Sequence, residues 1–419
     1  MTRSAPVYAD AASLLPAPPA SWRESFARLA NRRVLLVSHE LTLTGAPLIL
    51  LELAQRMRNS GARIDLVSLR DHEERNALVR RVATRVLPVA HSHDAAAGAD
   101  LIIANTVLAH AWIRHFVEVH PDRARRLVWW IHENDTEKYA ARIASLDPVR
   151  TVVFDSHAGL EAWRATGLRM PPEAPVIHPC VDEALVSAVA RGRDAFAAGF
   201  VRRALTRIGV PPRALTRREI RAALGVREGE FLLSLFATYS PAKGQDLMAR
   251  LAGRMLRDEP GRPLKLLFVG FGSQRRAQRF LAGLDPWERR AIDSRRALPT
   301  IGDLAPYYRA TDAYVMNSQG RGENFGRVAI EAMAFGLPVL GTDAGGTREI
   351  VVPERTGLLH PVGEAGQATL ARNIRRLMDD RALGPALGGA GRERVHRHFA
   401  EDRFYTGWGD IIEEICGRK

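Results

Sequence analysis

The stretch RRVLLVSHELTLTGAPLILLELAQRMRNSGARIDLVSLRD, residues 32 to 71, contains one complete folding unit. Its start, Arg32 to Glu40, has four consecutive apolar residues between polar flanks, which is typical of a strand buried on both faces. The loop LTLTGAP follows, and LILLELAQRMRNSG reads as a helix with Gly61 as its stop signal. The segment ARIDLVSLRD is the next strand, and a strand, helix and strand in this order predict a parallel sheet.

The same alternation continues on both sides of a long interruption. Further strands are predicted at 100–106, 126–133, 150–156, 230–237, 264–271, 313–318 and 337–343. The interruption, residues 181–224, is rich in Arg and Ala and contains two adjacent prolines, so it reads as a linker or helical excursion. With 419 residues, the chain suits two α/β domains, each a doubly wound, Rossmann-like parallel sheet.

Composition narrows the functional classes. The chain has 60 Lys and Arg against 47 Asp and Glu, and this net charge of +13 predicts attraction to an anionic surface or a phosphorylated substrate. Peripheral contact with an anionic membrane stays open, but the chain shows no nucleic-acid-binding motif, so nucleic acid is not an expected partner. No apolar run is long enough to span a bilayer, and no secretion signal is evident. We therefore expect a cytoplasmic protein, with two buried and inert cysteines.

The most informative motif is ENFGRVAIE, which runs from Glu323 to Glu331. The two carboxylates stand eight residues apart, and a helix is predicted to begin near Gly326 between them. Helical geometry separates them by at most about 12 Å, which is too far to share a metal but suits the two ends of one extended ligand. The helix-start amides between them favour an anion. The motif therefore fits a sugar, a diphosphate and a ribose in series, although a loop Glu and a helix-capping Glu would leave the same pattern.

Three further positions follow predicted strands. Lys243, in YSPAKGQDLMARLAG, lies just before a helix, from where an ammonium can neutralise a leaving diphosphate. Gly45, in LTLTGAP, allows close approach of the backbone to a ligand, and the helix after Pro47 presents its N-terminus. His132 ends the strand RLVWWIHE, at the edge where doubly wound folds bind ligands. Taken singly, an exposed lysine, a tight turn and a structural histidine explain these residues equally well.

Taken together and in this order, the motifs resemble the E-x7-E retaining glycosyltransferases of family 4. The continuation AMAFGLPVLGTDAGGTREIV, with its paired glycines, follows the same pattern. The resemblance implies a GT-B architecture, in which two doubly wound domains face each other across a cleft. The implied domains are an acceptor-side domain at 1–195, onto which the C-terminal helix 402–419 packs back, and a nucleotide-sugar-binding domain at 196–401.

The resemblance also implies roles for individual residues. Glu323 would contact the donor sugar, Glu331 the ribose, Gly45 the donor phosphates, and His132 would orient the reacting sugar. Lys243, with Glu323 and His132, would act in catalysis. The backbone amides that would hold sugar hydroxyls and phosphate belong to Asn324, Phe325, Gly326, Val328 and Ala329.

One departure from the family pattern concerns the phosphates. Many members carry an Arg five residues before the Lys, where this chain has Thr238. Hydroxyls such as those of Thr238 and Ser240, or an arginine such as Arg275 or Arg327, are the alternatives for that contact.

The implied reaction moves a sugar from a nucleoside diphosphate sugar to a glycan or lipid-linked acceptor, with retention of configuration, in bacterial surface polysaccharide assembly. No cofactor is expected beyond the donor as co-substrate, and no Asp-x-Asp sequence is present to hold a divalent metal, so we expect a metal-independent enzyme. A nucleotide-sugar epimerase or an inverting transferase of the same fold, and a non-catalytic basic binding protein, are the alternatives.

Overall fold

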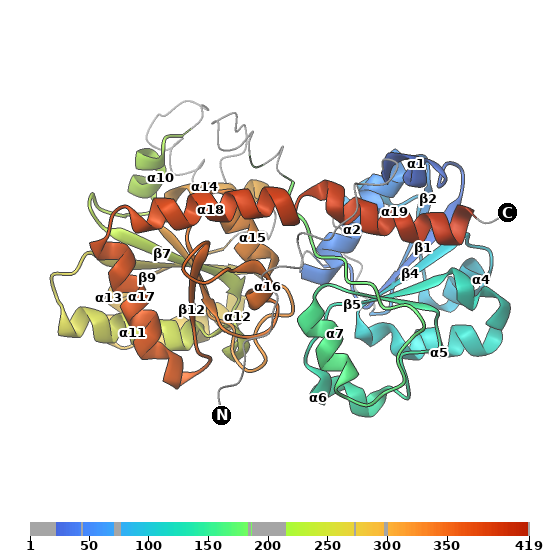
Figure 1. Ribbon diagram of the computed structural model, residues 1–419, viewed down its shortest axis with the longest axis horizontal. Coiled ribbons are helices and arrows are strands. Elements are labelled where there is room, and N and C mark those ends of the chain that lie inside the picture. The colour runs from blue at the N-terminus through green and yellow to red at the C-terminus, as the bar shows by residue number, and fades with distance from the viewer. Residues whose placement is uncertain are drawn as a thin grey trace. The chain divides into compact units, whose positions relative to one another are not determined.

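A computed structural model describes residues 22–42, 45–70, 77–182, 186, 215–271, 274–296 and 301–417. These residues divide into two compact units, one formed by the chain up to Pro179 together with the segment from Asp402 on, and one formed by Cys180–Glu401. We describe each unit by itself (Figure 1).

The sheet of the first unit is fully parallel, with strand order β3-β2-β1-β4-β5-β6. Its strands are β1 (Arg33–Ser38), β2 (Arg63–Ser68), β3 (Arg85–Leu87), β4 (Leu101–Asn105), β5 (Leu127–Ile131) and β6 (Thr151–Phe154). The four strands β1, β4, β5 and β6 are buried almost throughout, as their unbroken apolar runs predict. The chain order reverses between β1 and β4, and ligands of such sheets bind at the carboxyl ends of the strands beside such a reversal.

Helices lie on both faces of this sheet (Figure 1). They are α1 (Trp22–Ala27), α2 (Gly45–Asn59), α3 (Ala77–Val82), α4 (Ser92–Ala97), α5 (His110–Val119), α6 (Thr136–Tyr139), α7 (His157–Arg164) and α19 (Glu401–Gly417), with short 3-10 turns η2 (Val89–His91), η3 (Val107–Ala109), η4 (Pro121–Arg126) and η5 (Ala140–Arg142). The last helix, α19, packs into this unit although it ends the chain. Its Trp408 is fully buried with its ring 4.7 Å from that of Trp130, and Asp402 accepts a 2.8 Å hydrogen bond from Trp22 Nε1.

The sheet of the second unit repeats this topology, with strand order β12-β11-β10-β7-β8-β9 and parallel pairing throughout. Its strands are β7 (Phe231–Thr238), β8 (Leu264–Phe271), β9 (Ile292–Arg296), β10 (Ala313–Met316), β11 (Val339–Thr342) and β12 (Gly357–His360). Counted from its own first strand, this unit has the same order as the first unit, with the reversal between β7 and β10. The sequence-based prediction of two doubly wound sheets is confirmed.

Both faces of the second sheet are covered by apolar side chains. Leu232 and Phe236 of β7 belong to one buried cluster, whereas Leu233 and Leu235 belong to another, as the alternation of side chains along a strand requires. The helices are α10 (Arg217–Ala223), α11 (Gln245–Asp258), α12 (Gln274–Ala282), α13 (Pro286–Ala291), α14 (Ile301–Ala310), α15 (Arg327–Ala334), α16 (Thr347–Ile350), α17 (Gln367–Asp379) and α18 (Leu383–His398), with the 3-10 turns η6 (Pro241–Lys243) and η7 (Glu364–Gly366).

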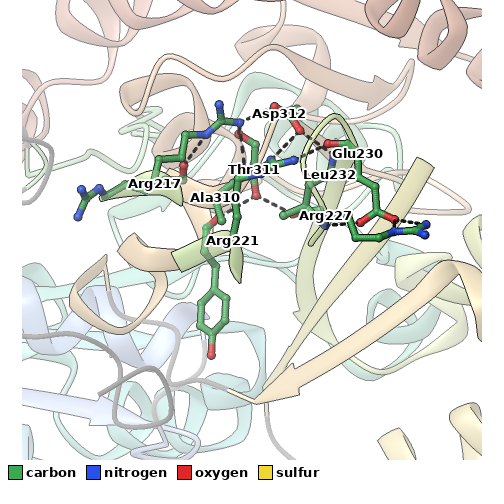
Figure 2. A network of polar contacts seen from close by, with 11 residues as sticks. Arg217, Arg221, Arg227, Glu230, Leu232, Ala310, Thr311 and Asp312 are labelled. Atoms are coloured by element: carbon green, nitrogen blue, oxygen red, sulfur yellow. Dashed lines mark hydrogen bonds and ion pairs between the residues drawn. The ribbon is translucent and has the colours of Figure 1, made fainter. Parts of the chain in front are cut away.

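A polar network fixes α10 to the amino-terminal edge of this sheet (Figure 2). Arg217 and Arg221 both form ion pairs with Asp312. The Asp312 carboxylate also accepts a hydrogen bond of 2.7 Å from the amide of Leu232. Since these groups lie at the opposite end of the strands from the candidate site, the network is structural.

The structure corrects or extends several sequence-based details. Gly45 lies in the first turn of α2 rather than in the loop before a helix that starts after Pro47. The short edge strands β3, β9 and β12 were not predicted.

Most of the Arg-rich stretch lies outside the described residues, and so does the predicted domain boundary at residue 195. That boundary stays a prediction, although Val181, which pairs with Phe399, already belongs to the second unit. Within the described ranges, no helix combines the length and apolar character needed to cross a membrane.

Candidate functional site

The carboxyl edge of the second sheet brings Lys243 and Glu323 together at the chain reversal. Lys243 ends the η6 turn that follows β7, and Glu323 lies in the loop that follows β10. The Lys243 ammonium lies 2.7 Å from Glu323 Oε1 and 2.5 Å from Oε2. Both side chains are about one quarter exposed, so the pair is partly shielded from water yet reachable. Two residues that the sequence marked separately therefore form one charged pair.

The Glu323 carboxyl stays ionised in this setting. Burial alone would raise its pKa, but the Lys243 ammonium and the hydrogen bonds from Lys243 and Ser318 outweigh burial and lower the pKa below its ordinary value. The Ser318 hydroxyl donates to Glu323 Oε2 over 2.7 Å. A carboxylate that stays charged at neutral pH accepts hydrogen bonds from hydroxyl groups, as the predicted contact with a sugar requires.

The loop that carries Glu323 rests directly on the loop after β11. The Gly346 amide donates to the Glu323 carbonyl over 2.9 Å. A Cβ at Gly345 would lie 2.2 Å from the same carbonyl, and one at Gly346 would lie 2.1 Å from the carbonyl of Asn324. Gly345 also has a φ of +56°. The paired glycines of the sequence motif are thus needed for two backbones to touch and to fix the path of Glu323.

The helix α15 begins beside this pair, as predicted, with Gly326 at its N-cap. Its first turn closes tightly, because the Ala329 amide donates to the Gly326 carbonyl over 2.9 Å. The Ala329 amide is therefore engaged within the protein, which counts against its predicted contact with the donor. Within the described part of the chain, the amides of Gly326 and Val328 form no such bond, and a helix start with open donors favours an anion.

The other predicted backbone contacts lie in the loop that leads into α15. Phe325 is buried and packs on Phe399 with their ring centroids 5.5 Å apart, so its side chain anchors the loop. Asn324 is the next residue towards Glu323, and its carbonyl is the group that crowds Gly346.

The second glutamate of the motif lies inside the protein. Glu331 is 2% exposed, and its Oε2 accepts a 2.9 Å hydrogen bond from the Tyr308 hydroxyl. Arg327, one turn earlier on α15, lies with its Nε 3.2 Å from Glu331 Oε1. Because Arg327 is held by Glu331, an Arg327 contact with phosphate would have to share the guanidinium with this carboxylate. The predicted Glu331 contact with a ribose stays a prediction.

Thr238 ends β7, and its carbonyl accepts a hydrogen bond of 2.9 Å from Gln245 Nε2. Its side chain carries no charge, so Lys243 is the cation that the β7–α11 connection contributes to this edge.

In the first unit, His132 follows β5 at the carboxyl edge of the sheet. Its Nδ1 lies 2.6 Å from Asp155 Oδ2, and its Nε2 lies 2.6 Å from Asn105 Oδ1. The side chain is 7% exposed, and Asp155 is also held by Trp130 Nε1 at 2.7 Å. The ring orientation is therefore fixed by Asn105 at the end of β4 and by Asp155 just after β6, and its predicted role toward the sugar stays a prediction.

Two further residues of the first unit are Glu133, which follows His132 in the sequence, and Gly45, which begins α2. The Glu133 carboxylate accepts the Val107 amide at 2.9 Å, and burial raises its pKa, so this residue supports the loop after β4. Gly45 is exposed, and within the described residues a Cβ there would meet nothing within 4 Å. Its predicted phosphate contact stays a prediction.

Sequence reasoning missed several polar residues of both edges. Asn105, Asp155, Tyr308, Ser318, Asn317 and His360 all contact the candidate residues or their loops. Asn105 and Asp155 each stand at or next to the end of a predicted strand, and that position was the available signal.

Comparison with protein families agrees with this arrangement. A glycosyl-transferase family 4 model matches residues 30–192, and a glycosyl transferases group 1 model matches residues 231–380. The chain belongs to this glycosyltransferase family. Each model covers the sheet of one unit, so the family match and the observed fold coincide.

Curated relatives match over part of their length. A D-inositol 3-phosphate glycosyltransferase of Nocardia farcinica is 37% identical over 182 residues, which are 41% of this chain and 40% of the relative. A GDP-mannose-dependent alpha-mannosyltransferase of Mycobacterium tuberculosis is 50% identical over 62 residues, 15% of this chain and 16% of the relative. The chain thus spans about two fifths of the length of the first of these relatives.

Solved structures match over nearly the whole chain. HepE of Anabaena in complex with UDP-glucose has a TM-score of 0.67 at 21% identity, covering 91% of this chain and 98% of that one. The sucrose-phosphate synthase of Thermosynechococcus elongatus has a TM-score of 0.61 at 20% identity, with the same coverage. At this identity the likeness concerns the fold, which is GT-B.

Proposed function

We propose that this chain transfers a sugar from a nucleoside diphosphate sugar to an acceptor hydroxyl. The observation that carries the proposal is the Lys243–Glu323 pair at the chain reversal of the second sheet, next to the start of α15. An ammonium, a charged carboxylate and a helix start meet there, and a diphosphate joined to a sugar needs a cation, hydroxyl acceptors and amide donors. One relative is named as GDP-mannose-dependent and one structural neighbour is in complex with UDP-glucose, and both support a nucleotide-sugar donor.

Each of these residues contacts a different part of the donor. When the glycosidic bond breaks, negative charge builds on the leaving β-phosphate, and Lys243 and the amides at the start of α15 stabilise it. Glu323 accepts hydroxyl groups of the donor sugar, and Glu331 holds the ribose. The binding of a donor hydroxyl by Glu323 loosens its pairing with Lys243 and frees the ammonium for the phosphate.

Retention of configuration is part of the proposal. The incoming hydroxyl attacks the face that the diphosphate leaves, and a phosphate oxygen accepts its proton, so that no covalent sugar-enzyme intermediate forms. We further propose a hexose as the transferred sugar and no requirement for a divalent metal.

The acceptor is proposed to be a glycan or a lipid-linked sugar in surface polysaccharide assembly, handled in the cytoplasm or at the inner face of the membrane. The net charge of +13 supports binding to anionic headgroups or to a phosphorylated acceptor. Inositol phosphate is a useful first acceptor to assay, because the relative from Nocardia farcinica is named for it.

A donor screen tests the proposal. UDP, GDP, ADP and TDP sugars are each tested for a rise in the thermal unfolding midpoint, since a ligand that binds the folded state stabilises it. The donor that protects is then incubated with inositol phosphate and with lipid-linked acceptors, and proton NMR of the product gives the anomeric configuration. Activity in excess EDTA tests the metal requirement.

Other outcomes of the screen would identify the alternatives. A new nucleotide sugar formed without any acceptor would indicate an epimerase, and an inverted product would indicate an inverting transferase. Binding to DNA or anionic vesicles that weakens steeply with salt, without protection by any donor, would indicate a non-catalytic basic protein.

A further inference from the structure

A buried amide links three strand ends directly behind the Lys243 turn. Asn317 follows β10, is 1% exposed, and donates from Nδ2 to the Gly244 carbonyl over 2.9 Å. Its Oδ1 faces Nε2 of His360, the last residue of β12, at 3.0 Å. His360 is also 1% exposed. The amide therefore joins the turn after β7 to both β10 and β12.

The turn itself depends on this contact. Gly244 has a φ of +66°, and a Cβ there would lie 2.3 Å from the Asn317 carbonyl oxygen and 2.7 Å from Asn317 Nδ2. Asn317 thus forms the surface on which the Lys243-Gly244 backbone rests. Since the Gly244 amide donates to the Pro241 carbonyl at 3.1 Å, a shift of Gly244 would move the whole η6 turn that carries Lys243.

Gln319 adds a second attachment to the same turn. Its backbone amide donates to the Ala242 carbonyl at 2.8 Å, and its side-chain Nε2 donates to the Asn317 carbonyl at 2.6 Å. The residues on either side of Lys243, Ala242 and Gly244, are therefore both tied to the strand end that leads to Glu323.

The hydrogen-bonded chain of His360, Asn317 and Gly244 is called the bridge below. At its histidine end, Nε2 of His360 is the hydrogen-bond donor. Burial lowers the pKa of His360 to about 4, although Asp343 acts in the opposite direction, so the ring is neutral at physiological pH. The amide orientation of Asn317 is fixed by the Gly244 carbonyl, which leaves Oδ1 to accept, so His360 carries its proton on Nε2. The bridge is then a directional chain from His360 through Asn317 to Gly244.

We propose that Asn317 and His360 are positioning residues that act on the donor through Lys243. They hold the turn so that the ammonium stays beside Glu323 in the free protein and within reach of the leaving phosphate once the donor is bound. This role rests on the proposed transfer activity. It predicts that loss of the bridge lowers turnover because the Lys243 cation is misplaced, rather than because the unit unfolds.

A double-mutant cycle separates the two causes. Asn317→Ala and Lys243→Ala are made singly and together, and kcat and KM are measured with UDP-glucose or GDP-mannose, whichever the wild-type protein uses, per folded molecule. Asn317→Ala should lower kcat by about 10- to 100-fold with a smaller change in KM, as expected for a misplaced catalytic group. In the Lys243→Ala background it should lower kcat by less than about twofold, because residues that act as a unit are not additive.

Asn373 of α17 provides a matched control, because its amide donates to the strand residue next to His360. Asn373 is a buried asparagine whose Nδ2 donates to the Leu359 carbonyl at 3.1 Å, next to His360, and among the described residues it forms no hydrogen bond with the turn. Asn373→Ala should leave kcat of the folded protein within about twofold of wild type, since it removes one hydrogen bond of similar strength. If Asn317→Ala does not fold, His360→Phe takes its place in the cycle, because it removes the donor to Asn317 and keeps the ring volume.

The outcomes distinguish failure of the positioning role from failure of the proposed function. Equal losses from Asn317→Ala in both backgrounds, or a kcat of the folded variant equal to wild type, overturn the positioning role while wild-type turnover stands. Absence of turnover of every donor by the wild-type protein refutes the proposed function itself, and the positioning role with it.

Discussion

Lys243→Met tests the electrostatic centre of the candidate site. The substitution removes the ammonium that lies within 2.7 Å of both Glu323 oxygens and replaces it with an uncharged chain of similar length. Glu323 keeps its hydrogen bond from Ser318 and its burial. Because burial is the largest influence on this carboxyl and acts to raise its pKa, the pKa of Glu323 should move from below its ordinary value to above it.

The size of the effect follows from the partial exposure of the pair. Fully exposed ion pairs contribute about 0–1 kcal/mol, and removing one partner of a fully buried pair costs about 3–5 kcal/mol. With both side chains about one quarter exposed, Lys243→Met should lower the free energy of unfolding by about 2 kcal/mol at neutral pH.

The assay is denaturant unfolding between about pH 8 and pH 4. In the wild-type protein the lowered pKa of Glu323 contributes stability that is present above 4.5, the ordinary value, and is lost as the pH falls through the folded-state pKa. In the variant the raised pKa imposes a cost that is present at neutral pH and disappears as the carboxyl becomes protonated. The stability gap between the two proteins should therefore be full near pH 8 and should shrink towards pH 4.

A compensating substitution completes the test. Adding Glu323→Gln to Lys243→Met removes the unpaired charge, so the double variant should regain most of the lost stability at pH 8 and show no gap that depends on pH. A gap of constant size across the pH range, or no recovery on adding Glu323→Gln, would refute the electrostatic account of this pair.

Four further substitutions, one of them a control, test the surroundings. Tyr308→Phe removes the hydroxyl that donates to Glu331 and should cost about 1–2 kcal/mol in denaturant unfolding, with weaker nucleoside diphosphate binding by calorimetry. Gly345→Ala should weaken donor binding at least about tenfold, because a side chain at a crowded position with positive φ costs about 1–3 kcal/mol. Gly389 lies in open space on α18, so the control Gly389→Ala should instead raise the free energy of unfolding by about 0.5–1 kcal/mol. His132→Phe should lower turnover with nucleoside diphosphate affinity unchanged, and equal loss of both in a folded variant would contradict a role confined to the reacting sugar.

The sequence predicted the interior of both sheets because the central strands are continuous apolar runs. It failed at their edges for a physical reason. The strand β9, IDSRR, has one apolar residue, and β3 has three residues, so neither shows the periodicity of a buried strand. These edge strands form because the adjacent strand offers backbone hydrogen bonds, and this pairing cannot be read from the edge strand's own sequence.

The arrangement of the candidate site could be predicted where its parts are close in sequence. Glu323, Gly326 and Glu331 share one motif, and the helix start between them was readable from the spacing. The pairing of Lys243 with Glu323 joins residues 80 apart, and it appears only once the strand order places β7 beside β10. Thr106, which follows β4 next to Asn105, is another feature without a sequence signal, because it is buried with a φ of 74°, a conformation that a β-branched residue rarely adopts.

Because the β7–α11 connection has no second cation, the contribution of this connection to phosphate binding depends on the position of Lys243 alone. Residues 238–245, TYSPAKGQ, carry one positive charge, so no arginine in this segment can compensate when the Lys243 ammonium is displaced. A lysine ammonium on a flexible stem is positioned by its backbone and its partners rather than by a rigid fork. The buried bridge through Asn317 supplies that positioning on the backbone side, and Glu323 supplies it at the ammonium. Activity should consequently depend more steeply on the support of this turn than it would in a chain whose phosphate site has two cations.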